Sequence, residues 1–332
     1  MFRSFAAIAA ATATLIMAPP AGAEPNVGYR HMEIPDPAGP PVEVGVWFPT
    51  DAPATPRRLE LFEQTVAEDA APSAGQHPLI VMSHGNGGGF AGHYDTALAL
   101  ARAGYVVASL THTGDNYRDQ SRAIDLANRP RQLKLLIDYM LAAWPAHAAI
   151  DPERIGAFGF SAGGFTVLTE AGGAPNLKAF RPHCGVHPSY FDCTLISRFP
   201  ALANVMENAR PVWTHDSRLK AVVVAAPAVG FAFGRDGLAK VKVPIQLWAA
   251  EFDHILPVPD YAGAVRADLP SAPDYRLVAN ADHYDFLAPC SELFRQRVQQ
   301  DICASRPGFD RPAFHARFNA AVVQFFDAHL KR

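Results

Sequence analysis

RIGAFGFSAGG, residues 154–164, is an apolar run that ends in a serine flanked by glycines. The run predicts a buried strand over Arg154–Phe160, and the residues that follow, to about Gly172, predict a helix. A serine at such a junction occupies a strained turn that lifts its hydroxyl above the edge of the sheet. Gly159 and Gly163 carry no side chains that would collide where the strand and the helix approach each other. Ser161 is therefore a candidate nucleophile.

Apolar runs on both sides of this stretch alternate with amphipathic segments. Buried strands are predicted at 78–83 and 105–110, and further strands at 154–160, 219–225, 243–250 and 274–278. An edge strand is predicted at 42–48, with 27–34 as its pairing partner. Helices are predicted at 94–103, 131–144, 161–172, 259–269 and 311–330, with a short one within 59–66. This alternation is typical of an α/β fold with a mostly parallel central sheet and helices on both faces. Residues 174–218 break the alternation with five Pro and two Cys, so we expect a lid-like insertion there.

A nucleophilic serine needs a base and an acid that orients the base, and both are expected in loops after later strands. The base expected after the last predicted strand is His283. His254 is a second candidate, but it adjoins the expected acid on one loop, where neighbouring side chains rarely turn toward each other. The loop after the preceding strand offers Glu251 and Asp253 as the acid. Asp253 is preferred because it lies further into the loop.

Two backbone N–H groups are expected to bind the oxyanion that forms during acyl transfer. One is the N–H of Ala162, at the start of the predicted helix. The other is the N–H of Asn86, in the glycine-rich loop at 84–89. The glycines let this loop curl so that an amide faces inward. No Gly-Lys-Ser/Thr follows, which argues against a phosphate-binding loop.

Composition and charge exclude several classes of protein. The 332 residues are 49% hydrophobic and 18% charged, which rules out wholesale disorder. Lys and Arg total 29 against 32 acidic residues, and the formal net charge is −3. Because no run of like charges breaks this balance, neither a nucleic-acid groove nor a polybasic membrane patch is expected.

The first residues have the pattern of a secretory signal peptide. Arg3 precedes an apolar stretch over residues 5–18, and small residues lead up to Ala23, after which we expect cleavage. The apolar stretch is shorter than the ~20 residues that span a bilayer, so no stable membrane anchor is expected. Residues 24–332 then form a single domain in the periplasm or outside the cell.

Export affects how the cysteines are interpreted. All four lie in the predicted mature chain, and an oxidising compartment favours disulfides over the alternative of buried free thiols. Three pairings are possible in principle. Short loops cost little entropy to close, which favours Cys184 with Cys193 and Cys290 with Cys303.

Other polar clusters are interpreted as structural. His84, and His112 with Asp115, follow strand ends and are expected to make supporting hydrogen bonds. His183 and His187 adjoin Pro and Gly, which we expect to prevent a shared helical face. No metal site and no cofactor is therefore predicted.

Six stretches together resemble a known family. They are SHGNG at 83–87, GYVV at 104–107, THTGD at 111–115, GFSAGG at 159–164, HYDFLAPC at 283–290 and FDRPAFH at 309–315. They resemble the exported bacterial α/β-hydrolases called predicted dienelactone hydrolases, a group similar to platelet-activating-factor acetylhydrolases. The resemblance implies the α/β-hydrolase fold and supports Asp253 over Glu251, because an Asp ahead of a loop Pro is the matching position. Dienelactone hydrolase proper has a Cys nucleophile where this chain has Ser161, so lactone opening is not implied.

These patterns predict a serine ester hydrolase that works through an acyl-enzyme on a small-molecule ester, lipid-like esters included. Hydrolysis of amides or peptides by the same three residues stays an alternative, as does a binding protein that keeps the fold without catalysis. The sequence does not indicate the acyl group, the alcohol or the oligomeric state.

Overall fold

The computed structural model describes residues 25–200, 211–298 and 300–331. The predicted signal peptide therefore lies outside the described residues. Across the part that is described, no helix is both long and apolar enough to cross a membrane.

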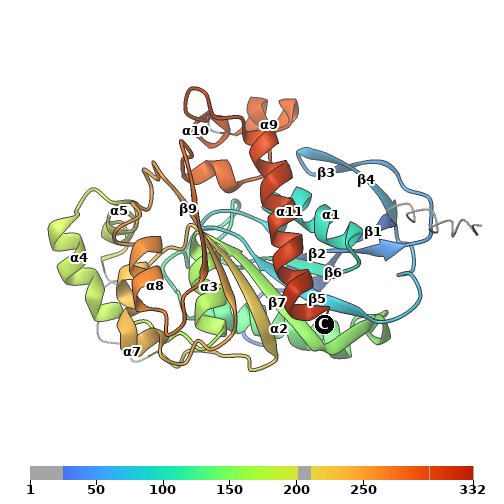
Figure 1. The fold of residues 1–332 in the computed structure, drawn as a ribbon, viewed down its shortest axis with the longest axis horizontal. Helices are drawn as coiled ribbons and strands as arrows, with labels where there is room; N and C mark the ends of the chain where they lie inside the picture. Colours follow the sequence, from blue (N-terminus) through green and yellow to red (C-terminus); the bar gives the residue numbers. More distant parts are fainter. Residues whose placement is uncertain (1–24, 201–210, 299, 332) are drawn as a thin grey trace, which may run out of the picture.

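One mixed sheet forms the centre of the described chain (Figure 1). Its ten strands lie in the order β10-β9-β8-β7-β5-β6-β2-β1-β4-β3. The six strands from β10 to β6 are parallel to one another, whereas β2 is antiparallel to both β6 and β1. Their bounds are β1 Asn26–Ile34, β2 Val42–Thr50, β3 Thr55–Leu59, β4 Phe62–Glu68, β5 His77–Ser83, β6 Val106–Thr111, β7 Ile150–Phe160, β8 Leu219–Ala225, β9 Ile245–Ala250 and β10 Asp274–Val278. The predicted α/β class with a mostly parallel sheet is confirmed.

Helices and helical turns connect these strands. The α-helices are α1 Tyr94–Arg102, α2 Asn128–Ala142, α3 Ala162–Glu170, α4 Phe180–Val186, α5 Phe191–Ser197, α7 Gly234–Leu238, α8 Ala262–Asp268, α9 Glu292–Arg297, α10 Gln300–Cys303 and α11 Arg311–Leu330. The 3-10 turns are η1 Phe90–His93, η2 His147–Ala149, η3 Leu177–Ala179, η4 Gly230–Ala232 and η5 His283–Phe286.

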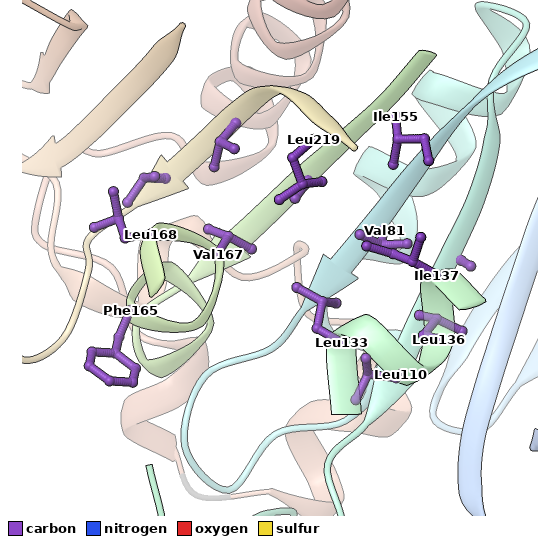
Figure 2. Close-up of a cluster of buried hydrophobic side chains, with 14 of the residues drawn as sticks. Val81, Leu110, Leu133, Leu136, Ile137, Ile155, Phe165, Val167, Leu168 and Leu219 are labelled. Atoms are coloured by element: carbon purple, nitrogen blue, oxygen red, sulfur yellow. The ribbon is translucent and has the colours of Figure 1, made fainter. Parts of the chain in front are cut away.

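Helices cover both faces of the sheet because its buried strands are apolar on both sides. On one face, α2 and α3 pack against side chains such as Val81 of β5 and Ile155 of β7 (Figure 2). Alternate strand residues, such as Ile80, point to the other face, where α1 and α11 cover them. Helix α2 buries a stripe at helical spacing, Leu133, Leu136, Ile137 and Met140, all with no exposed surface. Full burial of each such side chain contributes about 1.5–3 kcal/mol.

The short helix predicted within 59–66 is wrong. Strands β3 and β4 form an antiparallel hairpin there, with Glu60 at its turn in a left-handed conformation, φ 49°. Every second residue of β4 from Phe62 to Val66 is buried, and the residues between them are exposed. This period of two is the burial pattern of a strand.

The segment at 174–218 carries η3, α4 and α5 in its described part, on the same side of the molecule as α7 and α8 (Figure 1). A disulfide joins Cys184 to Cys193 within it, and a second joins Cys290 to Cys303. Both pairings are those predicted from short loop closure.

Candidate active site

Ser161 begins α3 directly after β7, and its backbone is in a strained conformation. Its φ is 56° and its ψ is −119°, a combination that costs a non-glycine residue energy and persists only where the surroundings impose it. Two backbone hydrogen bonds hold the turn: the Ser161 N–H donates to the Ala225 oxygen at 2.9 Å, and the Ser161 oxygen accepts from Ala228 N–H at 2.9 Å. The predicted strand-to-helix turn is therefore present.

The glycines around Ser161 are required by close backbone approach. A Cβ at Gly159 would lie 2.1 Å from the Gly163 oxygen, and one at Gly163 would lie 1.9 Å from the Ser83 oxygen. Both neighbours are backbone atoms, which cannot move aside cheaply. Helix α3 thus packs directly on the ends of β7 and β5, as the sequence pattern predicts.

Three side chains from separate loops form a continuous hydrogen-bonded chain at this end of the sheet. His283 Nε2 lies 3.1 Å from Ser161 Oγ, and His283 Nδ1 lies 2.8 Å from Asp253 Oδ2. Asp253 Oδ1 accepts backbone N–H bonds from Ile255 at 3.1 Å and Leu256 at 2.6 Å. All three members of the chain are buried, which excludes most of the water that would compete for these bonds.

The two alternative residues lie apart from this chain. Glu251 is exposed, and its Oε2 accepts the Asn280 N–H at 2.8 Å. His254 points to Asp282, with its Nδ1 2.6 Å from Oδ1, and its side chain is 55% exposed. Of the residues considered for base and acid, the structure brings His283 and Asp253 to Ser161 and leaves Glu251 and His254 outside.

The turn that carries His283 is fixed by a network that sequence reasoning missed. The Asp282 side chain accepts the Asp285 N–H and the Asp285 side chain accepts the Asp282 N–H at 2.8 Å, which makes a reciprocal capping box. Asp282 also accepts the His283 N–H at 2.7 Å. Asp285 has no exposed surface and also accepts from Arg311 Nε at 3.1 Å. The spacing Asp-x-x-Asp at 282–285 is the signal that could have indicated this cap.

The loop after β5 is held by a buried ion pair. Asp115 Oδ1 accepts from Asn86 Nδ2 at 2.7 Å and from the Gly87 N–H at 3.0 Å. Its other oxygen lies 2.5 Å from Arg129 Nη1, and Arg129 also donates to the backbone oxygen of His84. The backbone N–H groups of Asn86 and Ala162 make no hydrogen bond to another described residue. They are thus left available at the loop and at the start of α3.

Two buried histidines beneath this loop are uncharged. Burial is the largest cause that lowers the pKa of His84 and of His112 well below the usual range, and the Arg129 guanidinium lowers both further. His84 Nε2 accepts the His112 backbone N–H at 2.9 Å, while His84 Nδ1 lies 2.6 Å from the Gly85 oxygen. Both rings are structural, as the sequence analysis predicts.

A cavity of about 530 Å³ opens beside Ser161 and His283. Its walls are mainly aliphatic and aromatic, formed by Leu61, Phe62, Ala91, Phe160, Phe191, Ile255, Leu287, Phe294, Val298 and Ile302. The only described residue of the 174–218 segment among its lining residues is Phe191. The β3–β4 hairpin and the loop closed by Cys290–Cys303 supply much of the rest, and sequence reasoning did not place either segment at the site.

The expectation for His183 and His187 does not hold. His183 lies in α4 and His187 caps the C-terminal end of that helix, with ring centroids 5.2 Å apart. Pro182 lies in the first turn of α4, where a missing N–H costs nothing, so it does not interrupt the helix. The two imidazoles therefore share one face.

Comparison with known proteins identifies the fold. No protein-family model and no curated protein matches the chain. Among solved structures, a ferulic acid esterase from Streptomyces cinnamoneus matches with a TM-score of 0.62 over 95% of this chain and 92% of that chain. The fold is that of the α/β-hydrolases. At 19% identity the match carries the fold alone, and the narrower resemblance to predicted dienelactone hydrolases stays a prediction.

Proposed function

We propose that this α/β-hydrolase is a serine ester hydrolase in which Ser161 is the nucleophile, His283 the general base and Asp253 the orienting acid. The observation that carries the proposal is the chain of hydrogen bonds from Asp253 through His283 to Ser161 at the wall of an apolar cavity. The esterase named among the solved structures supports the choice of ester substrates.

In the first half of the reaction, His283 Nε2 takes the proton of Ser161 Oγ as that oxygen attacks the ester carbonyl. Asp253 accepts from Nδ1, which fixes the imidazole tautomer and stabilises the imidazolium that forms. The two N–H groups of Ile255 and Leu256 on Asp253 hold this carboxylate in place. His283 then protonates the leaving alcohol, and the acyl group stays on Ser161.

The backbone N–H groups of Asn86 and Ala162 form the oxyanion hole. Each such donor contributes roughly 3 kcal/mol to stabilisation of the transition state. Asp115 supports the Asn86 donor by binding the side chain of Asn86 and the next backbone N–H together. In the second half of the reaction, His283 deprotonates a water that attacks the acyl-enzyme and releases the acid.

The cavity indicates the class of ester. Contact of its aromatic and aliphatic walls with water is unfavourable, so replacement of that water by an apolar or aromatic acyl group lowers the free energy. A small-molecule ester of this kind, lipid-like esters included, is the proposed substrate. We also propose export to the periplasm or the medium after cleavage at Ala23, which is in keeping with the two disulfides.

Replacement of Ser161 by Ala tests the function. Without the hydroxyl no acyl-enzyme can form, so kcat/KM for p-nitrophenyl esters should fall by about 10³-fold or more. Labelling by a fluorophosphonate probe should be lost in the same variant. Ser197→Ala is the matched control, because among the described residues this exposed hydroxyl donates to the Thr194 oxygen alone, and it is not a lining residue of the cavity.

Two results would decide against the proposal. Ester turnover by Ser161→Ala at the wild-type rate would show that the chemistry lies elsewhere. Faster turnover of a matched p-nitroanilide than of the ester would favour amide hydrolysis by the same residues.

A further inference from the structure

A cluster of two histidines and two aspartates lies outside the proposed catalytic site. His183 and His187 come from α4, Asp192 from α5, and Asp260 from the turn that leads into α8. These elements lie together at one side of the molecule (Figure 1). Imidazole and carboxylate are the ligands, other than thiolate, by which proteins bind zinc.

The spacing within the cluster is close to that of a coordination sphere. One potential ligand atom from each of His183, His187 and Asp260 lies within 4.8 Å of the other two. His187 Nε2 and Asp260 Oδ2 are 3.8 Å apart. Ligand atoms around a tetrahedral zinc ion lie about 3.3 Å from one another, so the His187–Asp260 pair has to close by about half an ångström and no pair by more than about 1.5 Å. The side chains of His187 and Asp260 are 30% and 31% exposed, which leaves them free to make this adjustment and leaves a path for the ion.

The framework that presents the cluster is rigid. The disulfide joins Cys184 to Cys193, the residues directly after His183 and Asp192, and so fixes the turns that carry these two side chains. The His183 ring stacks on Phe231 with a centroid distance of 3.6 Å and an interplanar angle of 8°. Tyr261 Oη lies 3.2 Å from His183 Nε2 and donates to Asp192 Oδ1 at 2.8 Å. A preorganised ligand of this kind loses little entropy when it binds a metal.

A buried polar atom in the cluster lacks a partner. Asp192 is 7% exposed, and its Oδ2 makes no hydrogen bond in the described structure. An unpartnered carboxylate oxygen in a buried position costs free energy that a cation would recover. Asp192 lies 3.9 Å from His183 Nε2 through its other oxygen, so its negative charge acts directly on the cluster.

We propose that His183, His187 and Asp260 bind one zinc-class divalent ion, with Asp192 as a charged partner beside the ligands and water in the remaining position. Three protein ligands and one water complete a four-coordinate sphere. The ion would tie α4 directly, and α5 through the Cys184–Cys193 disulfide, to the turn that leads into α8. Phe191, which is next to Asp192 in α5, lines the cavity beside Ser161. Metal binding would therefore also fix part of the cavity wall.

Metal titration of the mature, tag-free chain with both disulfides intact tests the proposal. After removal of metals with a chelator, calorimetry with ZnCl₂ should show one ion bound per chain. His187→Ala and Asp260→Asn should each weaken the affinity at least 30-fold. The visible absorption of bound Co²⁺ should report a four-coordinate site in the wild type and be lost in both variants.

The controls separate a built site from chance binding. His31→Gln is matched, because His31 is also a partly exposed histidine close to a carboxylate, 3.1 Å from Glu43, but it belongs to no cluster of potential ligands among the described residues. It should bind Zn²⁺ like the wild type. Melting curves of the metal-free proteins check that each variant folds, and His187→Gln replaces His187→Ala if the latter does not. Absence of stoichiometric binding, or equal binding by folded variants and wild type, would overturn the proposal. None of these readouts depends on ester hydrolysis.

Discussion

At the scale of single residues, the acid of the proposed triad can be tested against its neighbour. Asp253 accepts from His283 Nδ1, whereas the one donor to Glu251 within the described part of the chain is the Asn280 backbone N–H. Asp253→Asn should lower kcat for p-nitrophenyl esters by about 10³–10⁴-fold, because an amide N–H facing Nδ1 favours the wrong tautomer. KM should change little, since Asp253 does not line the cavity.

Glu251→Gln is the control for this prediction. The amide oxygen of Gln can still accept the Asn280 N–H, so the loop is kept and activity should stay within about two-fold of the wild type. A loss in Glu251→Gln that equals the loss in Asp253→Asn would remove the basis for this assignment.

The order of strands along the chain can locate the site residues that follow the ends of parallel strands. Ser161 comes directly after β7, Asp253 follows the end of β9 after two residues, and His283 follows the end of β10 after four. The carboxyl ends of these parallel strands meet at one edge of the sheet. Arg129 carries no such signal. It lies in the first turn of α2, ahead of the stripe that predicts the helix, and only the fold shows that Asp115 and the His84 oxygen meet it.

At the scale of elements, the last residue of helix α3, Glu170, has a buried carboxyl group without hydrogen-bond partners in the described structure. Glu170 has no exposed surface, and neither of its oxygens makes a hydrogen bond in the described structure. Burial raises the pKa of Glu170 to about 9, and the negative charge of Asp216 adds to the effect, while Lys134 and Arg218 oppose it. Glu170 is therefore protonated in the folded chain at neutral pH.

Because the pKa of Glu170 is raised in the folded chain, its contribution to the free energy of unfolding falls as pH rises. Between the ordinary value of 4.5 and about 9, the unfolded chain loses this proton and the folded chain keeps it. The contribution of Glu170 to stability is thus greatest below pH 4.5 and falls as pH rises toward 9. Glu170→Gln removes the ionisable group, so the stability of the variant relative to the wild type should be about 4 kcal/mol greater at pH 8 than at pH 5.

Urea unfolding of both proteins at a series of pH values measures this difference. Thr169→Ser, a change of the neighbouring buried side chain, serves as a control that alters α3 without altering charge. A stability difference between Glu170→Gln and wild type that does not vary with pH would contradict the prediction.

The sequence predicts an element correctly where its apolar residues form a continuous run or recur at helical spacing. The strands β5, β6 and β8 are continuous apolar runs, and α2 carries a stripe at helical spacing. The hairpin of β3 and β4 was missed because its strands are short and polar and gain their burial from Tyr94 and Phe294, which are distant in the chain. Helix α4 was missed because Pro182 and Gly185 lower its local propensity, and packing against Phe231 together with the disulfide compensates.

At the scale of the whole molecule, the cavity wall is assembled from segments far apart in the sequence. Phe62 of the hairpin stacks on Phe294 of α9 at 4.9 Å, and Ser291 Oγ donates to the Leu61 oxygen at 2.5 Å. Figure 1 shows α9 near the hairpin. Such contacts join residues more than 200 positions apart, so no local pattern could indicate them.

The Cys290–Cys303 disulfide closes the loop that carries part of this wall, including Phe294 and Ile302. Closing a loop with a sequence separation of 13 stabilises a fold by about 3 kcal/mol, mainly by restricting the unfolded chain. The free energy of unfolding of the double variant Cys290→Ser with Cys303→Ser, measured in urea, should be lower by about this amount.

The same variant should also bind substrate less well. Because the loop lines the cavity and does not touch the proposed triad, KM for a long-chain p-nitrophenyl ester should rise several-fold. The kcat for the acetate ester should change less than two-fold. An unchanged free energy of unfolding would show that the disulfide does not stabilise the loop. A fall in kcat with KM unchanged would show that the loop does not act as a wall of the cavity.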